Sequence, residues 1–295
     1  MRNRFKEHAL NSYGQEGLVW VTRIPQIIAA TKQHWNLTVS PPFELSYNYV
    51  APVTRADGQE VVLKIGFPKD PEFQTEITAL KVFNGDGITR LLEEDTENTA
   101  ILIERVVPGT SLSTMKDDEE RTRILAKAMR HLWKILPPDH HFPTVGDWAN
   151  GLTGYKNIPY ALVAKAEELF RELISTSGSA QLLHGDLHHD NVLRSGQDGW
   201  TIIDPKGVAA EPEYETAAMM RNPHRDIFSR PDLEALLARR AEILAQELGF
   251  DKQRLLKWAF AQTVLSGVWH EQEGKSSSDE IKIAEVLGRL LSQAE

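Results

Sequence analysis

Two neighbouring stretches constrain this chain more than any other part of its 295 residues: LHGDLHHDNV at residues 183–192 and IIDP at residues 202–205. A short apolar run, a turn-forming Gln-Asp-Gly and a second apolar run join them. Two short apolar runs on either side of such a turn predict an antiparallel hairpin. The hairpin would return Asp204, at the end of the second run, to the side of Asn191, at the start of the first. Polar side chains from two separate stretches are therefore expected to meet.

Asp186, Asn191 and Asp204 have the residue types and the spacing of a Mg²⁺-nucleotide phosphoryl-transfer site. Transfer of a γ-phosphoryl group needs a hydroxyl aimed in line and metal ions that neutralise the phosphate oxygens. Asp186 is the candidate catalytic residue, which would orient the hydroxyl and accept its proton. Asn191 and Asp204 are the candidate Mg²⁺ ligands, because carboxylate and amide oxygens suit this hard cation.

An earlier predicted hairpin, over residues 43–65, carries Lys64 in an apolar strand. A lysine at such a position normally faces solvent. The next element changes this expectation, because Asp-Pro at residues 70–71 predicts the start of a helix whose apolar stripe includes Glu76. An acid on a buried helix face requires a cation. We therefore expect Lys64 to pair with Glu76, with Glu72 as the alternative partner.

The motifs at residues 182–226 resemble those of the aminoglycoside phosphotransferase superfamily, which writes its catalytic loop as His-Gly-Asp-Leu-His-x-x-Asn. The loop HGDLHHDN at residues 184–191 matches this pattern, and its continuation to IDPKG at residues 203–207 is similar to the streptomycin 6-kinase branch, also called aminoglycoside and hydroxyurea kinases. The resemblance implies an ATP- and Mg²⁺-dependent O-phosphotransferase. Its acceptor would be a small hydroxylated molecule, such as streptomycin or a related aminoglycoside.

The fold that this resemblance implies is α+β and bilobal, like that of protein kinases. An antiparallel β-sheet with one key helix would form the N-terminal nucleotide-binding lobe, residues 1–105. A mainly helical C-terminal lobe, residues 106–295, would hold the catalytic and substrate-binding groups, after a hinge at about residues 104–109. Apolar periodicity agrees with this division, because it predicts helices at residues 21–35, 70–85, 119–136, 159–174, 231–248, 251–271 and 279–294.

The resemblance also implies how ATP is held. In kinase-like folds the strand lysine contacts the α- and β-phosphates and the helix glutamate fixes it, which would be the roles of Lys64 and Glu76. The hinge backbone, here from Glu104 to Val106, would hydrogen-bond to adenine. The sequence LSYNYV around Ser46 stands where protein kinases have a glycine-rich loop, and it contains no glycine. Backbone amides near Ser46 would hold the phosphates instead.

Acidic and aromatic residues after the hairpin favour a cationic acceptor. Glu213 and Glu215 follow the catalytic stretch closely, and Trp269 with Glu271 combines an aromatic ring with an acid. Such groups suit ammonium and guanidinium ions. The alternatives are that the acids are only solvated and that Trp269 lies in the core.

Two histidines, His184 and His188, are separated as zinc-binding histidines on a helix would be. Gly185 disfavours a helix there, so we expect both rings to support the loop through hydrogen bonds with the backbone. A Ser-His-Asp hydrolase is disfavoured because no Gly-x-Ser-x-Gly motif is present. A small-metabolite or hydroxyurea kinase of the same fold, or an inactive kinase-like protein that only binds a ligand, remain the alternatives.

Composition restricts the partners and the compartment. Acidic residues outnumber basic ones by 42 to 33, and the resulting charge of −9 disfavours nucleic acid or an anionic membrane as a partner. There is no cysteine, hence no disulfide, and no apolar run long enough for a signal peptide or a membrane span. We expect a cytoplasmic enzyme, and the sequence leaves its oligomeric state open.

Overall fold

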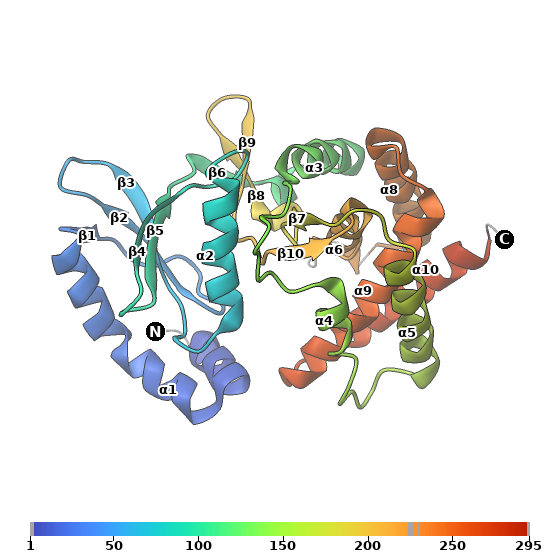
Figure 1. Cartoon of the computed structure of the whole chain (residues 1–295), viewed down its shortest axis with the longest axis horizontal. Helices are drawn as coiled ribbons and strands as arrows, with labels where there is room; N and C mark the ends of the chain where they lie inside the picture. The colour runs from blue at the N-terminus through green and yellow to red at the C-terminus, as the bar shows by residue number, and fades with distance from the viewer. Residues whose placement is uncertain (1–2, 224–226, 229, 294–295) are drawn as a thin grey trace. The chain divides into compact units, whose positions relative to one another are not determined.

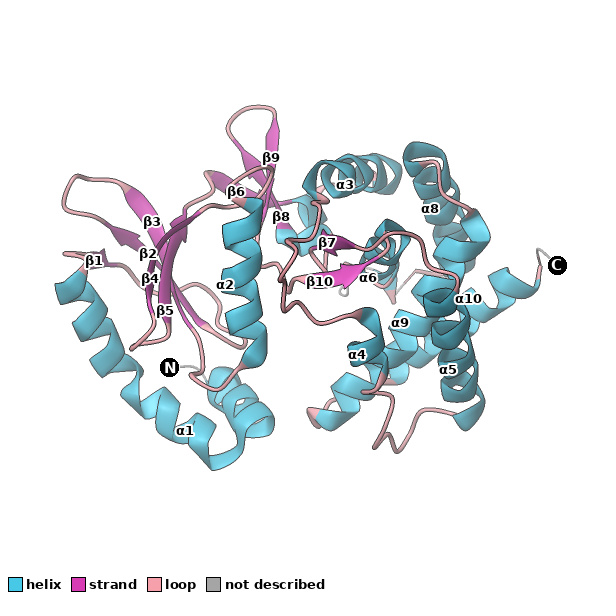
Figure 2. Ribbon diagram, viewed as in Figure 1, coloured by secondary structure: helices cyan, strands magenta, loops and turns pink. Residues whose placement is uncertain are grey.

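The computed structural model describes residues 3–223, 227–228 and 230–293. The chain divides into two compact units, Met1–Gly109 and Thr110–Glu295 (Figure 1). The division follows Gly109, four residues after the boundary placed by the sequence analysis. The first unit contains an antiparallel sheet, and the second is mainly helical (Figure 2).

The sheet of the first unit has five strands in the order β1-β2-β3-β5-β4, and its neighbouring strands are antiparallel. Its strands are β1 (Thr38–Val39), β2 (Tyr49–Thr54), β3 (Glu60–Ile65), β4 (Leu91–Asp95) and β5 (Ala100–Glu104). The predicted hairpin is confirmed as β2 and β3, which pair from Tyr49 with Ile65 to Thr54 with Glu60. Because β3 lies between β2 and β5, it is a central strand, and Lys64 is held in register on both sides by Val50 and Ile101.

Helix α2 (Pro71–Phe83) forms as its capping residues predict. The Asp70 side chain accepts a hydrogen bond from the Glu72 amide, Pro71 occupies the first turn, and Asn84 ends the helix in the left-handed conformation. Its buried residues include Glu76. The helix therefore begins and ends where local chemistry dictates.

Helix α1 (Asn3–His34) is longer than the predicted segment of residues 21–35. Its first half is polar and is interrupted at Gly14, whose backbone angles are not helical. Phe5 and Ala9, one helical turn apart, are nevertheless buried in a core with residues of β2, β3 and β5. Tertiary packing, rather than intrinsic propensity, therefore accounts for this half of the helix.

Helices make up most of the second unit, and the four long helices predicted within 159–294, together with the one at 119–136, are present. They are α3 (Asp118–Leu132), α4 (Val145–Ala149), α5 (Tyr160–Ser175), α6 (Ala217–Met220), α8 (Leu233–Leu248), α9 (Lys252–Gln272) and α10 (Ser278–Ser292). Helix α9 is buried almost all round and packs against α5, α8 and α10. Helix α3 ends at Leu132, earlier than predicted, because the backbone of Lys134 leaves the helix to pair with Leu182.

Two small sheets hold the polar stretches at residues 183–192 and 202–205. The hairpin of β8 (Val192–Ser195) and β9 (Gly199–Ile202) is confirmed, with Val192 opposite Ile202, and β6 (Pro108–Ser111) lies beside β8. Two strands that the sequence patterns did not predict, β7 (Gln181–Leu183) and β10 (Val208–Ala210), pair with each other. Three short 3₁₀ turns complete this region: η1 (Leu112–Thr114), η2 (His189–Asn191) and η3 (Pro212–Thr216). Both ends of the polar loops are thereby anchored in strands.

Among the described helices, none combines the length and the apolar character that crossing a membrane requires.

Candidate active site

His184 ties the two polar loops of the second unit together. It follows β7 directly, and its carbonyl oxygen accepts hydrogen bonds from the amides of Lys206 and Gly207, just before β10. Its ring bonds the backbone on both sides: Nδ1 accepts from the Asp186 amide at 3.1 Å, and Nε2 donates to the Ile203 carbonyl at 2.8 Å. Burial lowers the pKa of His184 to about 4, so the ring is neutral at pH 7. Both ring nitrogens of His184 are hydrogen-bonded to the backbone, as expected of a residue that supports the loop. Neither nitrogen is left to bind a zinc ion.

Glu215, from η3, holds the backbone of the same loop. Its carboxylate is buried and accepts hydrogen bonds from the amides of His184 at 2.7 Å and Gly185 at 2.9 Å. Burial raises its pKa to about 7 in spite of these amides. Glu215 was predicted to meet a cationic acceptor; the structure instead commits its oxygens to the backbone of the catalytic loop.

Gly185 is required where it stands for two reasons. Its φ of +84° is left-handed, which glycine adopts without strain, and a Cβ there would come within 2.7 Å of the Trp148 ring. Trp148, from α4, therefore packs directly against the catalytic loop. Trp148 was not predictable from the sequence, because nothing in its own neighbourhood connects it with residue 185.

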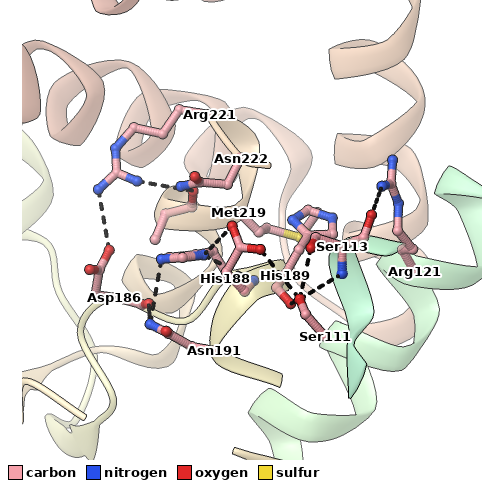
Figure 3. Close-up of polar contacts among 12 residues, drawn as sticks. Ser111, Ser113, Arg121, Asp186, His188, His189, Asn191, Met219, Arg221 and Asn222 are labelled. Atoms are coloured by element: carbon pink, nitrogen blue, oxygen red, sulfur yellow. Dashed lines mark hydrogen bonds and ion pairs between the residues drawn. The ribbon is translucent and has the colours of Figure 1, made fainter. Parts of the chain in front are cut away.

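Asp186 is half-buried near the start of this loop, with basic side chains around it. Its Oδ1 lies 3.3 Å from Nη2 of Arg221, and its backbone carbonyl accepts a hydrogen bond from Nδ2 of Asn191 at 3.0 Å (Figure 3). Burial opposes the ionisation of Asp186, but the electrostatic effect of Lys206, followed by those of the His188 ring and Arg221, outweighs burial and lowers the pKa of Asp186 to about 2. Asp186 is therefore a carboxylate at neutral pH, ready to accept a hydrogen bond from a hydroxyl.

Lys206 and Arg221 were not among the residues singled out from the sequence. Lys206 lies two positions after Asp204, and its Nζ is 5.5 Å from the centre of the Trp269 ring. Arg221 directly follows the apolar helix α6 and is buried. The sequence signal that could have identified Arg221 is a basic residue directly after a buried apolar segment.

Asn191 and Asp204 are brought together by the β8–β9 hairpin. The Ile203 amide donates to the Asn191 carbonyl at 3.0 Å, so Asp204 is the first residue after this pairing. Asp204 is exposed and has a φ of +58°, an unusual value for a residue other than glycine that aspartate tolerates better than most. The Asp204 carboxylate and the Asn191 side-chain amide both offer oxygen donors, and the hydrogen bond between the backbones of Ile203 and Asn191 places the two residues near each other. Such a pair fits Mg²⁺, which usually takes one or two protein ligands and completes its shell with water and phosphate.

His188 caps the short turn η2 within this loop. Its Nδ1 accepts a hydrogen bond from the Asp190 amide, and its Nε2 lies 3.4 Å from Nδ2 of Asn191. Burial lowers the pKa of His188. The ring thus supports the turn that carries Asn191, in the way the sequence analysis expected for both histidines of the motif.

In the first unit, Lys64 and Glu76 form a buried ion pair. The distance from Lys64 Nζ to Glu76 Oε1 is 2.5 Å, and the side chains are 4% and 8% exposed. Leu63 and Ile65 belong to the core shared with α1, so the alternation of β3 turns Lys64 to the opposite face, where α2 supplies Glu76. The structure thus joins the two predicted partners, and a solvent-facing Lys64 is ruled out. Burying two charges costs free energy that hydrophobic residues would not cost, which favours a functional reason for the pair.

Of the other predicted nucleotide residues, Glu104 and Val106 lie at the end of β5 as expected, whereas Ser46 lies before β2, which begins at Tyr49 and not at residue 43. Glu104 ends β5, and its carbonyl accepts a hydrogen bond from the Thr89 hydroxyl at 2.8 Å. Val106 follows it outside the sheet. Ser46 is exposed in the connection between β1 and β2, and its carbonyl interacts with the His8 ring of α1.

The remaining predicted acceptor residues differ in what they contact. Glu271 accepts hydrogen bonds from the amides of Lys156 and Asn157 and from the Ser277 hydroxyl, so its carboxylate is used within the chain, contrary to its predicted role. Trp269 is half-buried and packs edge-on against Trp148, with ring centres 5.9 Å apart. Glu213 is half-buried, and burial raises its pKa.

Comparison with known proteins identifies the family of this chain. A family model described as "Aminoglycoside/hydroxyurea antibiotic resistance kinase" matches residues 34–274. The chain belongs to this family. The prediction of an aminoglycoside-phosphotransferase-type kinase that uses an alcohol group as acceptor is thereby confirmed.

Individual relatives of this kinase cover most of its length. Streptomycin 6-kinase from Streptomyces glaucescens is 29% identical over 281 residues, covering 91% of this chain and 90% of that one. Hydroxyurea phosphotransferase from Kitasatospora aureofaciens is 29% identical, covering 93% of this chain and 82% of that one. The structure of a thermostable mutant of aminoglycoside phosphotransferase APH(4)-Ia, in a ternary complex with AMP-PNP and hygromycin B, superposes with a TM-score of 0.63 at 16% identity, covering 90% of this chain and 98% of that one. The predicted kinase-like fold is confirmed by this likeness.

Proposed function

We propose that this kinase transfers the γ-phosphoryl group of ATP, in the presence of Mg²⁺, to a hydroxyl of streptomycin or a related aminoglycoside. The observation that carries the proposal is the set of hydrogen bonds that joins Asp186 to Asn191, and Asn191 to Ile203 beside Asp204, with Asp186 ionised. This is the set of groups that aims a hydroxyl and holds the metal of a transferring phosphoryl group.

Each residue of the second unit has a defined part in this proposal. Asp186 accepts a hydrogen bond from the acceptor hydroxyl, aims its oxygen in line with the γ-phosphorus and takes its proton as the bond forms. Asn191 and Asp204 hold Mg²⁺, which when bound neutralises the phosphate oxygens. His184 and Glu215 keep the loop in position, so that no reorganisation is needed at the moment of reaction.

The first unit supplies the nucleotide-binding groups. Lys64 contacts the α- and β-phosphates of ATP, and Glu76 holds its ammonium in place by their 2.5 Å contact. The backbone of Glu104 and Val106 binds adenine, and the amides near Ser46 cap the phosphates. The complex of the related fold with AMP-PNP supports this use of a nucleotide.

For the acceptor we retain Glu213 and Trp269 as contacts, since Glu215 and Glu271 are used by backbone amides. Trp269 and Trp148 present adjoining rings within the second unit, and Gly185 brings Trp148 against the catalytic loop. Two indoles beside the loop suit an acceptor with rings of its own better than one the size of hydroxyurea. Hydroxyurea is the second candidate, because a hydroxyurea phosphotransferase is as similar in sequence as the streptomycin 6-kinase.

The test is ADP release with Mg-ATP and a panel of streptomycin, other aminoglycosides, hydroxyurea and small amino alcohols, with the phosphorylated product identified by mass spectrometry. Asp186→Ala should lower kcat by roughly 10²–10⁴-fold, the range for loss of a general base, and leave nucleotide affinity close to that of the wild type. Asp198→Ala is the matched control, because Asp198 lies in the same hairpin with a side chain 97% exposed. Wild-type turnover in Asp186→Ala would overturn the role given to Asp186.

The same panel separates this kinase from a protein that only binds its ligand. A pure binder would be thermally stabilised by the acceptor without consuming ATP. Saturable ADP release that depends on the acceptor excludes that alternative.

A further inference from the structure

Arg221 is the one described side chain whose polar atoms are within hydrogen-bonding distance of the Asp186 carboxylate. It is only 8% exposed, and its guanidinium points at Asp186, with Nη2 3.3 Å from Oδ1 (Figure 3). Its Nη1 donates to the carbonyl of Ala218 at 3.1 Å. Among the described residues, Oδ2 of Asp186 accepts no hydrogen bond, so the two carboxylate oxygens differ in their surroundings. The contact at Oδ1 restricts rotation of the carboxylate and leaves Oδ2 to an acceptor.

The short segment that carries Arg221 is itself held by Arg240 of α8. Nη1 of Arg240 donates to the carbonyl of Met219 at 2.8 Å and to that of Asn222 at 2.6 Å. These two carbonyls lie on either side of Arg221 in the chain. The backbone on both sides of Arg221 is therefore fixed by one guanidinium, which is 1% exposed.

Asp118 of α3 completes this arrangement. Its carboxylate receives Nε of Arg240 at 2.9 Å and Nη2 at 2.6 Å, a bidentate pair, and it also receives Nη2 of Arg121. A bidentate pair orients the planar guanidinium, so the remaining nitrogen is directed at the two carbonyls. A connected series of contacts thus runs from α3 through α8 to the carboxylate of Asp186.

A purely structural pairing of α3 with α8 would not require this geometry. Arg239 and Glu119, the adjacent residues on the same two helices, already make a bidentate pair at 2.9 and 3.0 Å. That pair is exposed and makes no contact with the segment of Arg221 among the hydrogen bonds of the described residues. The buried pair differs in that it reaches the carbonyls beside Arg221.

We propose that Arg221 is a positioning residue for phosphoryl transfer: it holds Oδ1 of Asp186 so that Oδ2 faces the acceptor hydroxyl, and the Asp118–Arg240 pair holds Arg221 in place. The inference rests on the proposed function, in which Asp186 receives the hydroxyl. Misplacement of a reacting group by about 1 Å can cost about 10²-fold in rate. Removal of the Arg221 side chain should therefore lower kcat. The KM for ATP should stay close to that of the wild type, because the nucleotide-binding groups are unchanged.

The experiment compares kcat and both KM values of the full-length wild type, Arg221→Ala, Arg221→Lys, Arg240→Met and Arg239→Met, each with its thermal midpoint. Arg221→Ala should lower kcat by about 10²-fold, and Arg221→Lys should lower it less because an ammonium can still reach Oδ1. Added guanidinium chloride, well below unfolding concentrations, should restore part of the kcat of Arg221→Ala, whereas sodium chloride of the same ionic strength should not. Arg240→Met should lower kcat by roughly tenfold through the displaced segment, and Arg239→Met should match the wild type.

Three results would overturn the inference. Wild-type kcat in Arg221→Ala removes the role of Arg221, and wild-type kcat in a folded Arg240→Met removes that of the Asp118–Arg240 pair. Equal effects of guanidinium and sodium chloride would mean that Arg221 acts on folding alone. No turnover by the wild type with any acceptor is a different result, because it would overturn the proposed function itself.

Discussion

Removal of the Glu215 carboxylate should destabilise the second unit and slow catalysis together. The carboxylate is 1% exposed and satisfies two buried amides, those of His184 and Gly185. In Glu215→Ala both amides lose their acceptor, and each unsatisfied buried donor costs roughly 1–3 kcal/mol. The loss is offset in part because the carboxyl is itself costly to bury, as its raised pKa indicates. We expect a net loss of about 2–4 kcal/mol, which corresponds to a fall in Tm of roughly 5–10 °C.

Differential scanning calorimetry and initial-rate kinetics measure the two effects. Glu213→Ala is the matched control for stability, because Glu213 lies on the same turn but is only half-buried; its Tm should change little, and the KM for the acceptor should rise if Glu213 contacts a cationic group. In Glu215→Ala, kcat should fall, because the loop that carries Asp186 is displaced. Equal Tm values for the two variants would refute the reasoning, since the loop amides would then have found other acceptors.

Three further predictions concern the metal, the nucleotide and pH. Asp204→Asn, chosen because asparagine tolerates the same positive φ, should raise the Mg²⁺ concentration needed for half-maximal activity; an unchanged requirement would contradict its role as ligand. Lys64→Met should raise the KM for ATP, while Lys81→Met, which removes a partly exposed ion pair between α2 and Glu94, should not, and equal kinetics in both would count against Lys64. The pKa of His184 is lowered from 6.5 to about 4 by burial, so its contribution to stability is present above pH 6.5 and is lost as pH falls toward 4, by roughly 3 kcal/mol in all. Urea unfolding between pH 4 and 7 should therefore show a flatter pH dependence in His184→Gln, and identical slopes would show that this ring is not the group responsible.

The local patterns of the chain were sufficient for much of this fold and site. A hairpin register depends on residues within a few positions of the turn, so the meeting of Asn191 and Asp204 followed from the sequence. The pairing of Lys64 with Glu76 was also predictable, since the apolar stripe of α2 placed an acid where only a cation could satisfy it. The first half of α1 escaped prediction, because it becomes helical by packing Phe5 and Ala9 on the sheet rather than by its own propensity.

Only the tertiary structure decided which contacts neighbouring residues of the same type make. Glu213 and Glu215 are the same residue type on one 3₁₀ turn, but with three residues per turn they point in different directions. One carboxylate thereby reaches amides thirty residues earlier in the chain, and the other does not. Arg239 and Arg240 are likewise the same residue type at adjacent positions. The rotation of about 100° per residue along α8 places Arg239 in an exposed ion pair and Arg240 in a buried one. Only Arg240 of these two donates hydrogen bonds to the segment that carries Arg221. A sequence specifies which groups are available, but contacts between distant segments depend on the packing that brings their backbones together.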